Sequence, residues 1–275
     1  MRLTIILPLS LFVIISPLAS KADMLPIKKL RAGLPPYAVA EKIVRHNDQV
    51  VNGKHGFESL QPPNTPHLIW LADCDARVQA TLFYPDPIDT VYTVRNPGNQ
   101  FLLSAGAIDY GVNELFTPVL LITGNTNNDS LRLFAKGYSH LSADLRRDLD
   151  MLRLSLGESA PDHEAGAKTE LLLVEKNVDF QVATAVKRYE QRIDRGRLTV
   201  IGGVIDLSNQ YGLGHNRLII ININGETDLE KLRSMHHLTR LDKRLLDLVG
   251  RKPWTEEKNQ NNKADNIPKK SPGKL

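Results

Sequence analysis

Three short apolar segments that each run into a polar turn constrain the fold of this chain more than any other feature. They are HLIWLAD (67–73), DTVYTVRN (89–96) and PVLLITG (118–124). The first two are rich in β-forming residues, and the third, which stops on a glycine, is typical of an interior strand of a parallel sheet. Residues 102–116, between the second and the third, have the length and small side chains of a buried helix. Strand and helix therefore alternate, which predicts an α/β fold.

The remaining patterns predict a central, mainly parallel β-sheet flanked by helices. Residues 36–53 have apolar side chains at helical spacing and end on a glycine, so they predict a helix. Residues 130–196 are mostly helical, with a break at GESAPDHEAGAK (157–168). After them, GRLTVIGGVIDL (196–207) and NRLIIININGE (216–226) predict two strands at one edge of the sheet.

Residues 228–249 predict one amphipathic helix. Thr227 and Glu230 have the spacing of a capping box, and leucines recur near one face. We expect this helix to pack on the domain. The alternative is an interaction protein that acts through this helix and the basic tail after it, so that removing residues 226–275 would abolish function while the core still folds.

The two ends of the chain differ in composition from the middle. Arg2 precedes an apolar stretch that Pro8 and Pro17 interrupt, and that falls short of the roughly 20 residues a membrane helix needs. Small residues place a cleavage site after Ala22, so we expect an exported protein, periplasmic or secreted, and not an integral membrane protein. The predicted order is a signal peptide (1–22), an N-terminal extension (23–37), a domain (38–225), a C-terminal amphipathic helix (226–250) and a disordered basic tail (251–275).

The charge distribution argues against a nucleic-acid-binding domain. The whole chain carries +4 at pH 7. Arg2 and Lys21 leave with the signal peptide, and residues 251–275 hold seven Lys or Arg against three acids, so the folded part is near −2. A basic surface for nucleic acid is therefore not predicted. The single cysteine, Cys74, also excludes an intramolecular disulfide.

Polar residues gather where the predicted strands end. ADCDARV (72–78) follows the first strand, VRNPGN (94–99) ends the second and TGNTNND (123–129) ends the third. Open α/β sheets place their sites at such strand ends, and polar turns at equivalent ends converge in space. The candidate functional residues therefore lie in these three turns.

The turns resemble those of the β-class carbonic anhydrases. The family's Cys-x-Asp-x-Arg motif is matched at Asp75 and Arg77, and its Arg-Asn-x-Gly-Asn landmark at RNPGN (95–99). GAIDYGVNEL (106–115) looks like the family's Ser-Ile-Glu-Tyr-Ala segment, and residues 177–212 are similar to its closing helix and strand. The resemblance implies a β-carbonic-anhydrase-like fold and a homodimer that pairs through the N-terminal helix and the sheet.

The same resemblance, which covers roughly residues 38–225, fails at the zinc ligands. In the family, a cysteine two residues before the aspartate and a Gly-His-x-x-Cys-Gly segment supply three ligands. The aligned residues are Asp73, Asn125 and Asn128, with Asp129 in place of the glycine. Neutral amides are poor replacements for thiolate or imidazole. We therefore expect no zinc and no other cofactor here.

Cys74 does not restore the zinc site by a shift of one residue. Successive side chains of an extended segment point in opposite directions, so its thiol is directed away from Asp75 and Arg77. We expect Cys74 to be a bystander in or near the core.

Two interpretations of the polar residues stay open. In the first, oxygen ligands bind Ca²⁺, Mg²⁺ or Mn²⁺ in place of zinc. Those ligands would be Asp73, Asp75, Asn125, Asn128 and Asp129. In the second, which we favour, Asn128 or Asp129 simply caps the helix that begins with SLRLFAKG.

The expected function follows from the altered zinc positions. The resemblance implies that zinc generates a hydroxide that attacks carbon dioxide, while the catalytic pair, Asp75 and Arg77, orients it. Without zinc, this pair organises the loop or holds a small anion such as bicarbonate, with Arg77, Asn99 and Asn125 as candidate binding residues. We expect a protein that keeps the fold for binding or assembly. The alternative is an active carbonic anhydrase that works without zinc or with an oxygen-ligated cation.

Overall fold

The computed structural model describes residues 35–52, 64–157 and 167–251. The chain divides into two units, Met1–Leu60 and Gln61–Leu275. The predicted signal peptide, almost all of the predicted basic tail and most of the predicted helix break lie outside the described residues.

The first unit contains the helix α1 (Pro36–Asn52), which confirms the helix predicted from the apolar spacing. Its Val39, Ile43 and Val44 side chains are 42%, 64% and 72% exposed. Val39 and Ile43, four positions apart, lie on the same side of the helix, so α1 carries an exposed apolar strip there.

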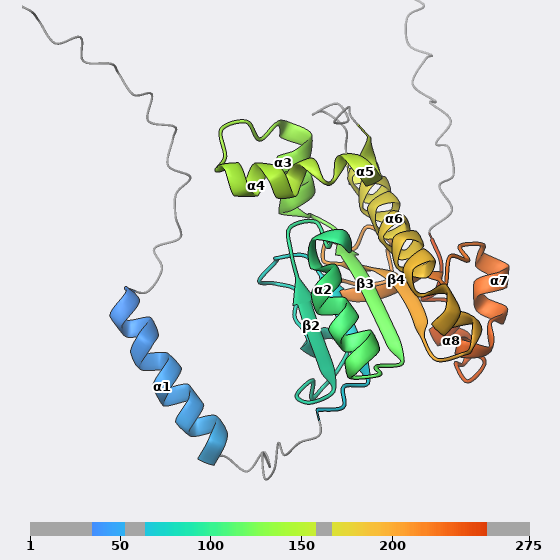
Figure 1. The fold of residues 1–275 in the computed structure, drawn as a ribbon, viewed down its shortest axis with the longest axis horizontal. Helices are drawn as coiled ribbons and strands as arrows, with labels where there is room; N and C mark the ends of the chain where they lie inside the picture. Colours follow the sequence, from blue (N-terminus) through green and yellow to red (C-terminus); the bar gives the residue numbers. More distant parts are fainter. Residues whose placement is uncertain (1–34, 53–63, 158–166, 252–275) are drawn as a thin grey trace, which may run out of the picture. The chain divides into compact units, whose positions relative to one another are not determined.

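The second unit is built on one five-stranded sheet with the order β2-β1-β3-β4-β5 (Figure 1). Its strands are β1 (Leu68–Ala72), β2 (Val91–Arg95), β3 (Val119–Asn125), β4 (Thr199–Asp206) and β5 (Arg217–Ile223). The strands β2, β1, β3 and β4 pair in parallel, and β5 pairs antiparallel with β4. The predicted α/β fold with a mainly parallel sheet is confirmed, as are the two late strands at one edge.

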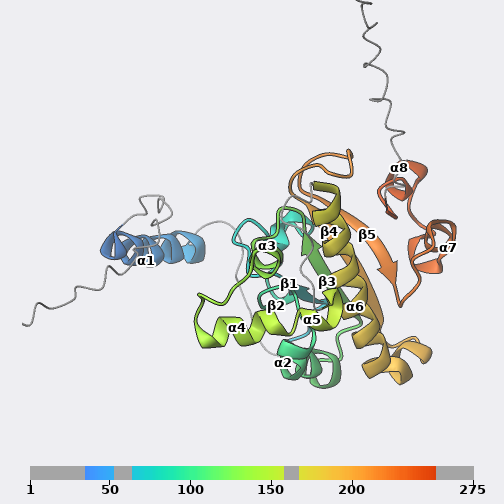
Figure 2. The ribbon, with the colours of Figure 1, turned by 90° about the horizontal axis from the view of Figure 1, so that it is seen from above.

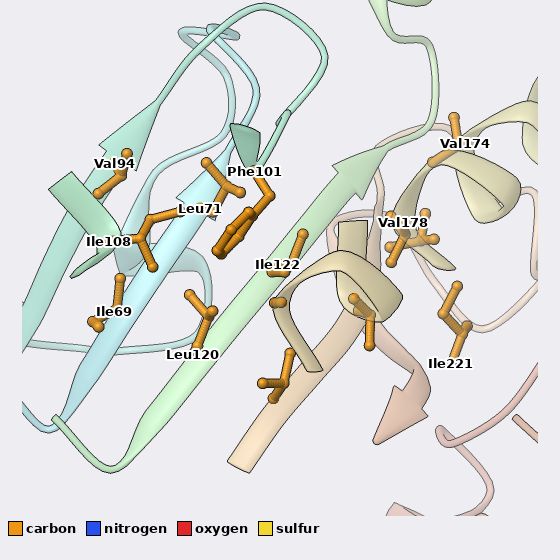
Figure 3. Close-up of a cluster of buried hydrophobic side chains, with 14 of the residues drawn as sticks. Ile69, Leu71, Val94, Phe101, Ile108, Leu120, Ile122, Val174, Val178 and Ile221 are labelled. Carbon is orange, nitrogen blue, oxygen red and sulfur yellow. The ribbon is translucent and has the colours of Figure 1, made fainter. Parts of the chain in front are cut away.

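Alternate residues of each strand enter different apolar clusters. Ile69 and Leu71 of β1 and Leu120 and Ile122 of β3 join the larger cluster (Figure 3). Trp70, between the first two, belongs to the smaller cluster on the opposite face. A slip of one residue would exchange the faces, so this pattern fixes the register and the point at which each strand ends.

Helices supply many of the larger cluster's other side chains. They are α2 (Ala105–Asp109), α3 (Asp129–Lys136), α4 (Ala143–Asp150), α5 (Arg153–Leu156) and α6 (Ala167–Asp194), which is kinked at Tyr189. α6 packs along β3 and β4 (Figures 1 and 2). Glycines permit this approach, because a Cβ on Gly124 would lie 2.6 Å from Val174 Cγ1 and one on Gly202 would lie 2.8 Å from Val182 Cγ2.

The helix predicted over residues 102–116 is present but not uniform. A 3₁₀ turn, η2 (Leu102–Ser104), precedes α2, and a π-helical turn, η3 (Tyr110–Glu114), follows it. A further 3₁₀ turn, η1 (Ala80–Leu82), precedes Phe83, whose ring meets Trp70 edge to face at 5.0 Å between centroids. Within the described ranges, no helix has the length and apolar character that crossing a membrane requires.

The prediction of one amphipathic helix over residues 228–249 is wrong. The segment forms three short helices, α7 (Leu229–Ser234), η4 (His236–Leu238) and α8 (Lys243–Leu246). Asp228, rather than Thr227, caps α7 through its carboxylate, and Asp242 caps α8 in the same way. Between the first two helices, Met235 is extended, with φ −63° and ψ 141°. The aspartates and the extended residue divide a leucine pattern that would otherwise suit one helix.

The leucines of this segment fold back onto the edge of the sheet. Leu232 and Leu238 are buried in a cluster with Ile223 of β5 and Val249. The apolar face is therefore covered by the chain itself, as the expectation of packing on the domain requires.

Candidate functional site

The three polar turns meet at the carboxyl ends of β1, β3 and β2. Asp73 directly follows β1, Gly98 lies in the turn after β2, and Asn128 precedes α3. Oδ2 of Asp73 accepts hydrogen bonds from the backbone N–H of Gly98 at 2.8 Å and from Nδ2 of Asn128 at 3.0 Å. The turns therefore converge as their places at equivalent strand ends predict.

Asp73 is a nearly enclosed carboxylate, only 4% exposed. A third donor, Ser130 Oγ on α3, lies 3.1 Å from its Oδ1. Burial raises the pKa of Asp73, and the hydrogen bonds from Asn128, Gly98 and Ser130 offset only part of that effect. All three donors are uncharged, so dipoles alone stabilise the ionised form.

The two asparagines bond to each other and to the ends of their own loop. Asn128 Nδ2 lies 3.1 Å from Asn125 Oδ1, and Asn128 Oδ1 accepts from the backbone N–H of Leu131 at 2.8 Å. Because that backbone group can only donate, it fixes which atom of the Asn128 amide is oxygen. The capping role predicted for Asn128 is confirmed, whereas Asp129 pairs with Arg132.

Asp75 and Arg77 form the predicted ion pair. Arg77 Nε lies 2.9 Å from Asp75 Oδ1, and Arg77 Nη2 lies 2.5 Å from Oδ2. The same Nη2 donates to the carbonyl of Asn127 at 2.9 Å, and Asn125 Nδ2 donates to Asp75 Oδ2 at 3.2 Å. The pair thus ties the β1 turn to the β3 turn, as its expected role in organising the loop requires.

The pair also sets the protonation of Asp75. Burial by itself would raise the pKa of this carboxyl, but the hydrogen bonds from the side chain and backbone of Arg77, together with its charge, hold the pKa below the usual value. The Asp75 side chain is 9% exposed and that of Arg77 is 47% exposed. Asp75 is therefore ionised at neutral pH beside a cation that faces solvent.

Arg95, the last residue of β2, is a site residue that the sequence reasoning did not single out. Its Nη1 donates to the carbonyl of Asp75 at 3.0 Å, its Nη2 donates to the carbonyl of Val78, and its guanidinium lies 5.2 Å from the ring centroid of Trp70. It thus shapes the backbone around Asp75 and Arg77. Its place as the first residue of RNPGN was the available signal.

Asn99, a candidate binding residue, is separate from the group around Asp73. It is fully buried, has a positive φ of 45°, and accepts from Asn177 Nδ2 of α6 at 3.3 Å. Asn177 also donates to the carbonyl of Gly98 at 2.8 Å. Asn99 therefore helps anchor the β2 turn to α6, while Asn125 and Arg77 lie together.

Cys74 is exposed, so its predicted place in or near the core is wrong. It lies between Asp73, which is 4% exposed, and Asp75, whose side chain is 9% exposed, so the two acids are enclosed while the thiol is not. Partial burial of the thiol and the nearby Asp73 carboxylate raise the pKa of Cys74. The thiol form therefore predominates at neutral pH, which does not favour a role as a nucleophile.

Comparisons with known proteins bear on this geometry. The sequence model of a family described as carbonic anhydrase matches residues 68–212, more than half of the chain. The chain belongs to the carbonic anhydrase family. Among curated proteins, none matches it.

Solved β-carbonic anhydrases share the fold. The Coccomyxa enzyme in complex with acetazolamide has a TM-score of 0.54 at 19% identity, over 74% of this chain and 92% of that one. CafA of Aspergillus fumigatus has a TM-score of 0.52 at 21% identity, over 75% and 98%. Tetrameric β-carbonic anhydrases of Sordaria macrospora reach 0.54 at 16%, over 68% and 95%.

The donor set at the positions that the resemblance assigns to zinc does not fit that ion. Asp73, Asn125 and Asn128 present one carboxylate and two amides, and zinc sites in proteins use thiolate, imidazole or carboxylate. An N–H of Asn128 already points at Asp73 and Asn125, where a metal would need lone pairs. The three side chains satisfy one another instead of converging on a cation.

These side chains also do not fit a cation that is bound through oxygen ligands. Asp75 is engaged by Arg77, the oxygen of Asn128 caps α3, and Asp129 pairs with Arg132. Over the described parts of the chain, no group of three or more His, Cys, Asp or Glu is arranged to hold a metal ion. The site is therefore a hydrogen-bonded cluster in which the Arg77 guanidinium is exposed.

We predict that the Asp73 carboxylate stabilises the fold. Asp73→Ala leaves three donors without an acceptor and is expected to lower the free energy of unfolding in urea by about 2–4 kcal/mol. Asp73→Asn keeps an acceptor for Gly98 and Asn128, so we expect it to lose less than about half as much. The control Asp194→Ala, at an exposed position, should stay within about 0.5 kcal/mol of the unmodified chain. An alanine variant as stable as this control would contradict the role given to Asp73.

We predict a pH window for the Asp75–Arg77 pair. The folded pKa of Asp75 lies below its ordinary value of 3.8, so its stabilising contribution is full above that value and is lost as pH falls through the folded pKa. The difference in unfolding free energy between the unmodified chain and Asp75→Asn should be constant from about pH 5 to 7 and shrink in more acidic buffer. Because the charge of Asp75 raises the pKa of Asp73, both chains in this comparison also carry Asp73→Asn. A gap that widens on acidification would show that the pair does not lower the pKa of Asp75.

Proposed function

We propose that this protein is an exported β-carbonic-anhydrase-like protein that uses its fold for binding or assembly and does not hydrate carbon dioxide with zinc. One observation supports the proposal: Asn128 Nδ2 donates a hydrogen bond to Asp73 Oδ2 at 3.0 Å and another to Asn125 Oδ1 at 3.1 Å. The Asn128 N–H groups occupy the space between these two oxygens, where a metal ligand would have to present a lone pair. Zinc-bound hydroxide, the nucleophile of the family reaction, has no place to form.

The Asp75 and Arg77 pair is better suited to bind a small anion than to catalyse a reaction. Arg77 is exposed, permanently charged and held in one orientation by Asp75 and the Asn127 carbonyl. Asp75 occupies the guanidinium edge formed by Nε and Nη2, so an anion would be held by the remaining nitrogen, Nη1, and by the charge of the group. We propose a small anion of the bicarbonate type as the ligand, with Arg77 as the main contact.

Metal content and activity together test the proposal. We predict that the purified chain contains far less than stoichiometric zinc and shows no carbon dioxide hydration above an Asp75→Ala control, as measured by elemental analysis and stopped-flow assay. Stoichiometric zinc with hydration that depends on Asp75 would refute the proposal. Hydration that depends on Asp75 in metal-free protein, or in protein with calcium, magnesium or manganese, would instead support the alternative enzyme.

A restored ligand set sharpens this test. The three positions lie within hydrogen-bond reach, so the triple change Asp73→Cys, Asn125→His and Asn128→Cys should let the chain bind zinc stoichiometrically. The matched control carries Asp73→Ser, Asn125→Gln and Asn128→Ser, which alters the same positions without adding soft ligands. Zinc in neither triple variant, with both folded by circular dichroism, would mean that the positions do not form a ligand set.

We further propose that the chain forms homodimers through α1. The helix exposes Val39 and Ile43 on one side, with Val44 exposed beside them, and exposed apolar surface of this kind often marks an interface. Relatives from Sordaria macrospora are described as tetrameric, so the fold supports association. Export, which the N-terminal sequence predicts, would place such an assembly outside the cytoplasm.

We predict that Ile43→Asp reduces the mass measured by light scattering to that of the single chain, because a charge on the apolar face opposes its burial. Gln49→Asp adds the same charge to a different face of α1 and should leave the mass unchanged. An equal loss of mass in both variants would point to unfolding of α1, and no change in either would exclude α1 from the interface.

A further inference from the structure

A hollow of about 540 Å³ lies between the last turns of α6 and the π-helical turn η3. η3 leads into β3, and the end of α6 leads into β4. The hollow therefore lies toward the amino ends of these strands, whereas the turns around Asp73 lie at the carboxyl ends. Three cations are among its lining side chains, Lys187, Arg188 and Arg192.

The backbone on both sides of this hollow departs from regular geometry. η3 is a π-helical turn, and Tyr189 interrupts α6 with φ −112° and ψ 19°. Phe116, two residues after η3, has a φ of +55°. A bulky residue with a positive φ is strained, and such strain and π-helical turns both occur preferentially at functional sites. Fold stability alone does not account for these features.

Phe116 is also an exposed aromatic residue beside the hollow. It is 70% exposed, and the guanidinium of the lining residue Arg192 lies 5.5 Å from its ring centroid. An exposed ring contributes little to folding, whereas it can bury a large apolar area against a ligand. Phe116 therefore offers an apolar surface at the edge of a charged hollow.

One acid of the lining is already neutralised within the protein. Asp109 Oδ1 accepts from Arg188 Nε at 2.8 Å and from the Tyr189 hydroxyl at 2.7 Å, and Arg188 Nη2 donates to Oδ2. The bonds from Arg188 and Tyr189 hold the pKa of Asp109 below its usual value, so the carboxyl stays ionised and paired. The charge of Asp109 is therefore balanced by Arg188.

The other two cations of the lining, Lys187 and Arg192, have no such partner. Neither of them forms an ion pair within the described residues. Glu190 is the remaining acid of the lining. An anion can therefore contact two cations without displacing an existing ion pair, and Glu190 is the one lining charge that opposes it.

We propose that this hollow binds a small organic anion in which a phosphate or carboxylate group is attached to an aromatic ring. The anionic group contacts Lys187 and Arg192, and the ring packs on Phe116. An inorganic anion would leave Phe116 exposed, and a neutral aromatic molecule would leave both cations without a partner. The site is separate from Arg77 and does not depend on whether Arg77 binds an anion.

Titration of the full chain with three probes tests the proposal. The probes are phenyl phosphate, inorganic phosphate and phenol, and calorimetry and the backbone amide signals of residues 187–192 report binding. We expect phenyl phosphate to bind about tenfold more tightly than either other probe and to shift those signals. Equal affinities for phenyl phosphate and inorganic phosphate would overturn the proposal. So would signal shifts confined to the turn around Arg77, or no binding at millimolar concentration.

Charge variants locate the anionic group. Arg192→Gln should weaken phenyl phosphate binding about tenfold. The control Arg195→Gln removes the same charge from an exposed position outside the lining and should leave the affinity unchanged. Glu190→Gln removes the opposing charge and should tighten binding. Equal losses in Arg192→Gln and Arg195→Gln would mean that overall charge attracts the probe, which would overturn the assignment to the hollow.

Phe116→Asn separates ligand binding from folding. Asparagine tolerates a positive φ better than phenylalanine, so this variant should melt at or above the temperature of the unmodified chain. It should bind inorganic phosphate as before but lose the preference for phenyl phosphate. A preference that survives would overturn the role given to Phe116. A lower melting temperature with loss of both phosphates would show that Phe116 serves the fold instead.

Discussion

The Asp73 carboxylate draws a hydrogen bond from each of three elements: the backbone of the β2 turn, the Asn128 side chain and the Ser130 hydroxyl. The carboxyl end of the sheet depends on this interaction, because it fixes the three turns relative to one another. Asn128 then orients Asn125, and Asn125 reaches the Asp75–Arg77 pair. The hydrogen bonds of the site thus connect one buried acid, Asp73, to the Asp75–Arg77 pair.

The electrostatics of this arrangement differ from those of the zinc site that the family resemblance implies. A dication compensates the charge of buried thiolates, whereas here neutral dipoles compensate a single carboxylate. Dipoles stabilise the buried negative charge less completely than a cation does. The pKa of Asp73 is therefore raised, because burial outweighs the hydrogen bonds. Because Asn128 also caps α3, exchanging one residue for a zinc ligand would disturb both the network and the helix.

Much of the fold could be predicted from the sequence because its signals are local. Apolar runs that stop at polar turns predict the strands. The motifs at Asp75 and RNPGN place those turns at strand ends. The capping role of Asn128 also follows from local chemistry.

The C-terminal segment could not be predicted as well. Leucines at helical spacing do not reveal that Asp228 and Asp242 start separate helices, or that these helices cover a surface of β5. Arg95 was missed since its role depends on carbonyls 17 and 20 residues earlier in the chain. The exposure of Cys74 depends on how its turn leaves the sheet, which the pattern does not specify.

Because Cys74 is exposed, a probe can be attached to the unmodified chain at this position. It is the chain's only thiol, and it stands between the buried acid and the paired acid of the site. A fluorescent or spin-bearing group attached there would occupy one defined place without any change to the sequence. Its mobility would register whether the turn around Asp73 and Asp75 stiffens when an anion arrives at Arg77.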